Sequence, residues 1–145
     1  MKILLGVDDS RHSHAAIELV MKAVWPKDTQ VLVVSASPRF FAGPGEAASP
    51  GVVERLIEEQ TVYHRDVAKR AVELLRGAGL KAETRVVQGD PREALVETAR
   101  AEGVDLIVVG SHGRTGLAKI LIGSVATHVV SHAPCNVLVV KLPNP

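Results

Sequence analysis

Glycine residues follow one of the apolar runs of the sequence at a spacing that suits an anion site. Gly110 and Gly113 are separated by two residues, and Gly123 and Ser124 follow after nine more, which gives the pattern G-x2-G-x9-G-S. Glycine adopts φ > 0 easily and lets the backbone approach a bulky group, and N–H groups at a helix start bind phosphate. We expect Gly110 and Gly113 to have φ > 0 beside a phosphate, and Gly123 and Ser124 to offer it free N–H groups.

Side chains near these glycines add to the predicted phosphate site. Arg114 and Lys119 bring positive charge, and His112 lies inside the glycine loop, within reach of a phosphate. The Ser124 hydroxyl either caps its own helix or donates to a phosphate oxygen. The alternative is that the glycines only punctuate a loop and Ser124 is only a cap, since glycine-rich loops after strands are common.

A second polar segment, Asp8 to Ser10, comes directly after the first apolar run. Ligands of open parallel sheets bind beyond the carboxyl ends of the strands, so we expect this segment to lie beside the glycine loop. Asp8 binds a ribose hydroxyl, binds a metal ion held by phosphates, or caps the helix that follows. The sequence leaves these three roles open.

Five apolar runs alternate with amphipathic segments, and these elements must position the polar residues. We expect strands at 3–7, 31–36, 82–87, 106–109 and 137–140. We expect helices from Ser10 to Trp25, from Val52 to Arg76, from Pro91 to Gly103 and over 125–130. The apolar face of the second helix is predicted to hold Val53, Leu56, Ile57, Tyr63, Val67, Ala71 and Leu74. Strands that are apolar on both faces predict a parallel sheet covered by helices on both sides.

Composition excludes several classes of function. Lys and Arg number 17 against 16 Asp and Glu, and only 3% of the 145 residues are aromatic, so a nucleic-acid partner is not expected. The single cysteine, Cys135, excludes an internal disulfide and suits a reducing compartment. No apolar run approaches the roughly 18 residues of a membrane span. We expect one domain over residues 1–145, in the cytoplasm, with no membrane partner.

Three other patterns are predicted to carry no chemistry. Residues 43–48 fit G-x-G-x-x-A, but Pro50 and Gly51 break the chain before a helix can open from the turn. His128 and His132 are four residues apart without a further ligand, which predicts solvated surface histidines. We predict no catalytic residue, because nothing in the sequence supports an assembly of Ser111 with His112 and Asp8.

Several blocks of the sequence resemble the universal stress protein family, specifically its ATP-binding branch, whose motif is G-x2-G-x9-G-S/T. They are ILLGVDDS, GDPREALVETARAEGVDLIVVGSHG, GSHGRTGLAKILIGSVATHVV and APCNVLVVK, and the resemblance extends over nearly the whole chain outside residues 38–55. It implies an α/β, three-layer open sandwich of the Rossmann-like or adenine nucleotide alpha hydrolase-like type. The five-stranded parallel sheet would have the order 3-2-1-4-5, with helices on both faces.

The resemblance also implies that ATP, with Mg²⁺ or Mn²⁺ as a companion ion, lies across the first and fourth strands. Val7 and Asp8 would contact the adenosine, Ala36 would flank the adenine, and Gly110 would lie under the ribose. The phosphates would lie on Gly113, Gly123, Ser124 and Val125. The full predicted binding set is Val7, Asp8, Ser10, Ala36, Val109, Gly110, His112, Gly113, Arg114, Gly123, Ser124 and Val125.

In function, the resemblance implies a nucleotide-dependent switch or sensor in a stress response, which is a binding protein rather than an enzyme. The alternative is a slow metal-dependent ATPase or phosphotransferase, with a metal held by Asp8 or Asp9 and a charge clamp from Arg114 and Lys119. The short apolar strand at 136–141 is expected at a sheet edge, where unpaired backbone groups favour a homodimer.

Overall fold

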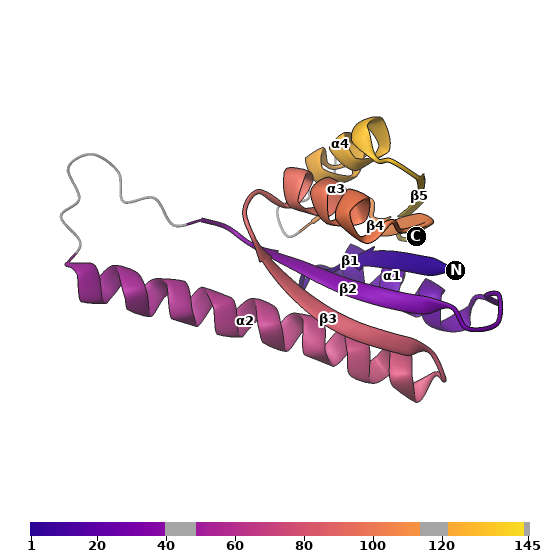
Figure 1. Cartoon of the computed structure of the whole chain (residues 1–145), viewed down its shortest axis with the longest axis horizontal. Coiled ribbons are helices and arrows are strands. Elements are labelled where there is room, and N and C mark those ends of the chain that lie inside the picture. The colour runs from indigo at the N-terminus through magenta and orange to yellow at the C-terminus, as the bar shows by residue number, and fades with distance from the viewer. Residues whose placement is uncertain (40–48, 114–121, 144–145) are drawn as a thin grey trace.

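Strands and helices alternate along the chain in the computed structural model, which describes residues 1–39, 49–113 and 122–143 (Figure 1). The strands are β1 (Lys2–Gly6), β2 (Gln30–Ser37), β3 (Lys81–Gln88), β4 (Leu106–Gly110) and β5 (Asn136–Val140). The helices are α1 (Arg11–Lys22), α2 (Pro50–Gly77), α3 (Pro91–Glu102) and α4 (Ser124–His132). The α/β class predicted from the apolar runs is confirmed.

The five strands form one parallel sheet in the order β3-β2-β1-β4-β5, as predicted. β1 lies in the middle, with β2 on one side and β4 on the other. The chain therefore builds the sheet in one direction from β1 to β3 and in the opposite direction from β4 to β5. The carboxyl ends of β1 and β4 mark this reversal, which is where open α/β sheets leave a crevice for a ligand.

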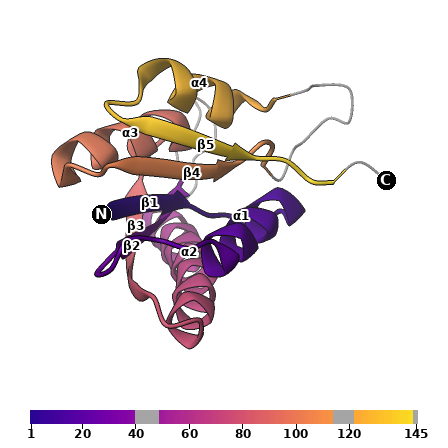
Figure 2. The same ribbon diagram turned by 90° about the vertical axis from the view of Figure 1, so that its right-hand side faces the viewer.

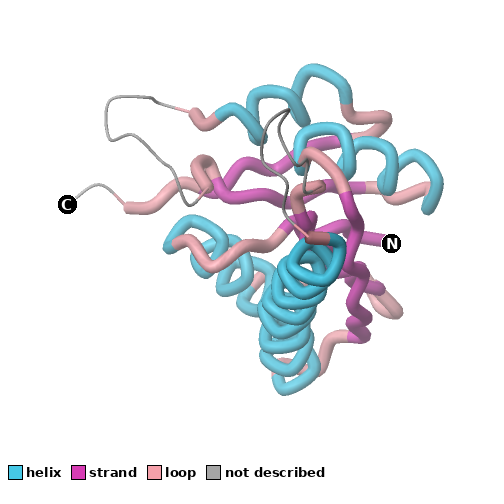
Figure 3. Tube along the Cα trace, turned by 90° about the vertical axis from the view of Figure 1, so that its left-hand side faces the viewer, coloured by secondary structure: helices cyan, strands magenta, loops and turns pink. Residues whose placement is uncertain are grey.

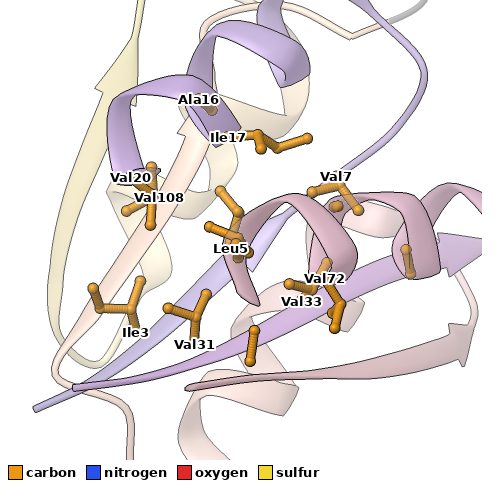
Figure 4. Close-up of a cluster of buried hydrophobic side chains, with 14 of the residues drawn as sticks. Ile3, Leu5, Val7, Ala16, Ile17, Val20, Val31, Val33, Val72 and Val108 are labelled. Atoms are coloured by element: carbon orange, nitrogen blue, oxygen red, sulfur yellow. The ribbon is translucent and has the colours of Figure 1, made fainter. Parts of the chain in front are cut away.

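Two hydrophobic clusters hold the helices on the sheet. α1 and α2 cover one face, and α3 and α4 cover the other (Figure 2). Leu5 packs in the first cluster, which Figure 4 shows together with Val20 of α1 and Val72 of α2. Leu4 and Ile107 pack in the second cluster, under α3 and α4. Because alternate residues of the central strands β1 and β4 are buried on opposite faces, these strands read as continuous apolar runs, whereas β3 at the edge has mostly exposed residues.

The buried face of α2 differs from the one predicted. Ile57 and Leu74 are 37% and 50% exposed, so their assignment to the core was wrong. The buried residues of α2 are His64, Val67, Ala68, Ala71, Val72 and Leu75, which recur at three- and four-residue intervals. Leu74 lies outside this row, and Ile57 belongs to the first turns of α2, which extend past the edge of the sheet in Figure 1. A polar His64 in the row concealed the true face.

The ends of the helices follow local chemistry. Ser10 is the N-cap of α1, as predicted, and its Oγ accepts a hydrogen bond from the Ser13 N–H at 3.1 Å. Asp90 caps α3 in the same way, and Gly103 ends that helix in the left-handed conformation with φ 59°. Within the three stretches that the structure describes, no helix is both long enough and apolar enough to span a membrane.

Candidate functional site

A cleft of about 520 Å³ lies at the carboxyl ends of β1, β2 and β4, on the edge of the sheet that faces the viewer in Figure 3. Its volume is within the range of small-molecule sites. The cleft is lined by these residues of the predicted binding set: Val7, Asp8, Ala36, Val109, Gly110, His112, Gly113, Gly123, Ser124 and Val125. The structure therefore brings together the turn after β1 and the glycine motif after β4, as the sequence predicts.

Gly110 has a different physical role from the one predicted. The described glycines with positive φ are Gly79, Gly89 and Gly103, so the prediction of φ > 0 at Gly110 and Gly113 was wrong. A Cβ atom at Gly110 would lie 2.7 Å from the carbonyl carbon of His12 and 2.8 Å from its oxygen. Gly110 is needed because the first turn of α1 packs directly on the end of β4.

Gly123 attaches the start of α4 to the loop after β4. Its N–H donates to the Ser111 carbonyl oxygen at 2.6 Å, so the prediction that this N–H is free was wrong. A Cβ atom at Gly123 would lie 3.1 Å from that oxygen and 3.2 Å from the Cα of His112. Gly123 is also the N-cap of α4, without a side-chain cap, and Ser124 is the first helical residue. The alternative in which Ser124 only caps its helix is thereby excluded.

The N–H groups at the start of α4 are the polar feature of this side of the cleft. In the first turn of a helix the N–H groups have no acceptor within the helix. Among the described residues, no atom accepts a hydrogen bond from the N–H groups of Ser124 and Val125. Both residues line the cleft. The helix dipole adds partial positive charge at this end. The arrangement suits an anion.

Asp8 uses its two carboxylate oxygens differently. Oδ1 accepts a hydrogen bond from the Ser10 N–H at 2.8 Å, and the Asp8 N–H donates to Ser13 Oγ at 3.0 Å. These bonds fix the turn between β1 and α1. Oδ2 points toward Gly113, where an added Cβ atom would lie 3.1 Å from it. Of the three roles left open for Asp8, the structure shows that one carboxylate oxygen stabilises the turn before α1. Asp8 also lines the cleft. Ser10 caps α1 and is not among the residues lining the cleft.

Two imidazole rings lie close together near the glycine loop. The rings of His12 and His112 are 4.9 Å apart, and His112 Nδ1 is 3.1 Å from Ser111 Oγ. Burial lowers the pKa of His12, as do the neighbouring His112 and Arg11, while Asp8 acts in the opposite direction. Ser111 is only 2% exposed. The predicted cations Arg114 and Lys119 lie outside the described residues.

Comparison with known proteins places the chain in a family. A profile of the "Universal stress protein family" matches residues 1–141. The chain belongs to the universal stress protein family. Universal stress protein MJ0531 of Methanocaldococcus jannaschii is 38% identical over 145 residues, which are 98% of this chain and 82% of the relative.

Solved structures of universal stress proteins share the fold. The structure of hypothetical protein MJ0577, a Methanocaldococcus jannaschii protein, superposes with a TM-score of 0.86 at 30% identity, over 99% of this chain and 97% of that one. A universal stress protein in complex with cAMP superposes with a TM-score of 0.69 at 26% identity, over 97% and 96% of the two chains. The Rossmann-like fold implied by the resemblance is confirmed.

Residues that were not predicted also line the cleft of this universal stress protein. They are Gly6, Ser13, Val34, Pro38, Gln60, His64, Pro91, Leu95 and Ala126. The most distinctive is His64, which is buried and whose Nδ1 lies 2.8 Å from the buried Ser35 Oγ of β2. A signal was present in the sequence, because Ser35 interrupts an apolar strand and His64 interrupts the apolar row of α2.

The structure describes one of the other two sequence patterns. The G-x-G-x-x-A segment at 43–48 lies outside the described residues. His128 is half-buried rather than solvated, because its Nε2 lies 3.3 Å from Glu93 Oε1 and its ring stacks on His132 at 4.1 Å. Burial raises the pKa of the half-buried Cys135 thiol, which favours its protonated form. In the described part of the chain, no group of three His, Cys, Asp or Glu residues is placed to hold a metal ion.

Proposed function

We propose that this chain binds an adenine nucleotide, with ATP as the principal ligand, in the cleft at the carboxyl ends of β1, β2 and β4. The start of α4 carries the proposal. Ser124 and Val125 line the cleft at the positive end of a nine-residue helix, and the N-cap residue, Gly123, has no side chain with which to cap that end. Gly113 and Gly123 line the cleft beside it. Helix starts with exposed N–H groups are the common phosphate sites of α/β proteins.

The rest of the cleft suits a nucleoside. Ala36 and Pro38 supply apolar surface for a base at the end of β2, and Val34 and Leu95 add apolar lining to the cleft. Asp8 lines the cleft between the two ends, and its carboxylate supplies an acceptor for a ribose hydroxyl or a ligand for Mg²⁺ or Mn²⁺ held by the phosphates. The cAMP complex of a universal stress protein 26% identical to this chain supports an adenine ligand.

We further propose that the single domain acts in the cytoplasm as a nucleotide-dependent switch or sensor in a stress response. Binding would order three separate segments at once: the turn after β1, the loop after β4 and α2, all of which line the cleft. A ligand that contacts several segments differently in two states shifts the equilibrium between those states. Family membership supports the stress context.

We propose that two chains pair through β5. This strand lies at the edge of the sheet, hydrogen-bonded to β4 on one side, and Val137, Leu138 and Val139 are only half-buried. An apolar edge strand is a template for pairing with a second copy. Sedimentation velocity at micromolar concentration is expected to give the mass of a dimer, and a monomer mass would exclude the pairing.

Calorimetric titration of the purified protein with ATP and AMP tests the binding proposal. We expect the wild type to bind and Gly123→Val to lose at least about tenfold in affinity, since two charge-assisted hydrogen bonds from the start of α4 are worth more than that. The added Cβ would lie 3.1 Å from the Ser111 carbonyl oxygen and displace the loop from α4. Gly51→Val is the matched control, because no atom of residues 1–39, 49–113 or 122–143 lies within 4 Å of a Cβ there.

Two outcomes would change this conclusion. Unchanged affinity in Gly123→Val, with a folded protein by circular dichroism, refutes the assignment of the phosphate site. Metal-dependent release of inorganic phosphate from ATP supports the alternative of a slow ATPase or phosphotransferase instead of a switch. Nucleotide that is retained through purification without turnover supports the switch.

A further inference from the structure

Two polar side chains of α2, Gln60 and His64, also line the cleft. We infer that the carboxamide of Gln60 recognises the 6-amino edge of the adenine base, and that His64 holds α2 in the position this requires. The inference rests on the proposed function, because it assumes that a nucleotide binds in the cleft. It assigns the choice of base to α2, which lies outside both the glycine motif after β4 and the turn after β1.

The direction of the ligand follows from the two ends of the cleft. If the phosphates lie on Ser124 and Val125, the base lies away from α4, toward the end of β2. β2 and β4 are two strands apart in the sheet, on either side of β1, a distance of about 10 Å. This distance matches the span of a nucleoside. Ala36 and Pro38 line the cleft at the base end.

The position of Gln60 over this end is set by a buried hydrogen bond. His64 Nδ1 lies 2.8 Å from Ser35 Oγ, and both side chains are buried, so this turn of α2 is fastened to β2 one residue before Ala36. Gln60 precedes His64 by four residues and lies on the same face of the helix, about one turn or roughly 6 Å further along the axis. That step places Gln60 near the level of Ser37, the last residue of β2, and Gln60 lines the cleft.

The chemistry of the two side chains differs. His64 is engaged with Ser35, whereas the Gln60 side chain is exposed on α2. A carboxamide has an N–H donor beside an oxygen acceptor, and adenine presents its 6-amino donor beside the N1 or N7 acceptor. Glutamine therefore pairs with adenine through two hydrogen bonds, as it does when proteins read this base in nucleic acids. The other polar side chains that line the cleft, Asp8, Ser13, His112 and Ser124, come from the β1 and β4 side.

A chemical double-mutant cycle isolates this contact. AMP and purine riboside 5′-monophosphate, which differ only in the 6-amino group, are titrated calorimetrically into the wild type and into Gln60→Ala. We expect the wild type to prefer AMP about tenfold, within the range of a two-bond amide–adenine pair, and Gln60→Ala to show less than about a twofold preference. Gln60→Met keeps the length of the side chain without the amide, and we expect it to behave like Gln60→Ala.

The control is Gln30→Ala, which makes the same change at the opposite end of β2 and should keep the tenfold preference. A tenfold preference that persists in Gln60→Ala and Gln60→Met overturns the inference and leaves the proposed function standing. A preference lost in Gln60→Ala and restored in Gln60→Met means that Gln60 acts by packing, which also overturns it. A wild type that binds AMP without preference overturns only this inference, whereas one that binds neither nucleotide overturns the proposed function as well.

Discussion

A methyl group at Gly110 should test why the glycine motif begins where it does. In Gly110→Ala the new Cβ would lie 2.7 Å from the carbonyl carbon of His12 and 2.8 Å from its oxygen and its Cβ. Unstrained carbon contacts need about 3.5 to 4.0 Å, so α1 must move away from β4 by close to 1 Å. The obstructing atoms are mainly backbone atoms of a helix and cannot rotate aside.

The expected cost is at the upper end of that for overpacking a well-packed site, about 3 kcal/mol. For a domain of this size, each kcal/mol lowers the melting temperature by roughly 2–4 °C, which gives a decrease of about 6–12 °C. The shift should also reach the cleft, because Ser13, on the same turn of α1 as His12, accepts the hydrogen bond from the Asp8 N–H. Chemical denaturation with urea measures the free energy of unfolding, and calorimetry measures the melting temperature.

Two other glycines supply the comparison. In Gly113→Ala the Cβ would meet, among the described residues, the Oδ2 of Asp8 at 3.1 Å, which is a side-chain atom rather than backbone, so we expect a loss below about 1 kcal/mol. Gly51→Ala, in the first turn of α2 and with no described residue within 4 Å of the new Cβ, should stabilise the protein by about 0.5 kcal/mol. If Gly110→Ala is as stable as the wild type, or no less stable than Gly113→Ala, the packing role of Gly110 is refuted.

Two further perturbations test the surroundings of the cleft. Ser35→Ala removes the buried hydrogen bond to His64 and should lower the free energy of unfolding by about 1–3 kcal/mol, measured in urea; no loss would mean that the bond does not hold α2. Asp90→Ala removes the N-cap of α3 and should cost about 1 kcal/mol at pH 7. Hydrogen bonds from Arg92 lower the pKa of Asp90 from 3.8 to about 2, so its contribution is present above pH 3.8 and lost as the pH falls through 2. The stability difference between wild type and Asp90→Ala should therefore shrink over that range, and a constant difference would contradict the assignment.

The fold and the location of the cleft were predictable because their signals are local. Strands buried on both faces read as apolar runs, as at Ile3 to Leu5, and Ser10 has the chemistry of an N-cap immediately before a helix. The spacing of Gly110, Gly113 and Gly123 marked the carboxyl end of β4, and the fold class brought it next to Asp8.

The roles of individual glycines were not predictable, because contacts with distant segments decide them. Gly110 is fixed by His12, nearly a hundred positions earlier, and the N–H of Gly123 is taken by Ser111 across the loop. The contribution of α2 was hidden for another reason. Its true face includes the polar His64, so apolar periodicity alone selected the neighbouring row with Leu74.

A crystal structure of the protein with bound ATP tests the central claim most directly. The account predicts phosphate oxygens within about 2.7–3.2 Å of the backbone nitrogens of Ser124 and Val125, with the base at the end of β2 near Ala36. A nucleotide found elsewhere on the molecule, or bound in the cleft with its phosphates away from the start of α4, would contradict it.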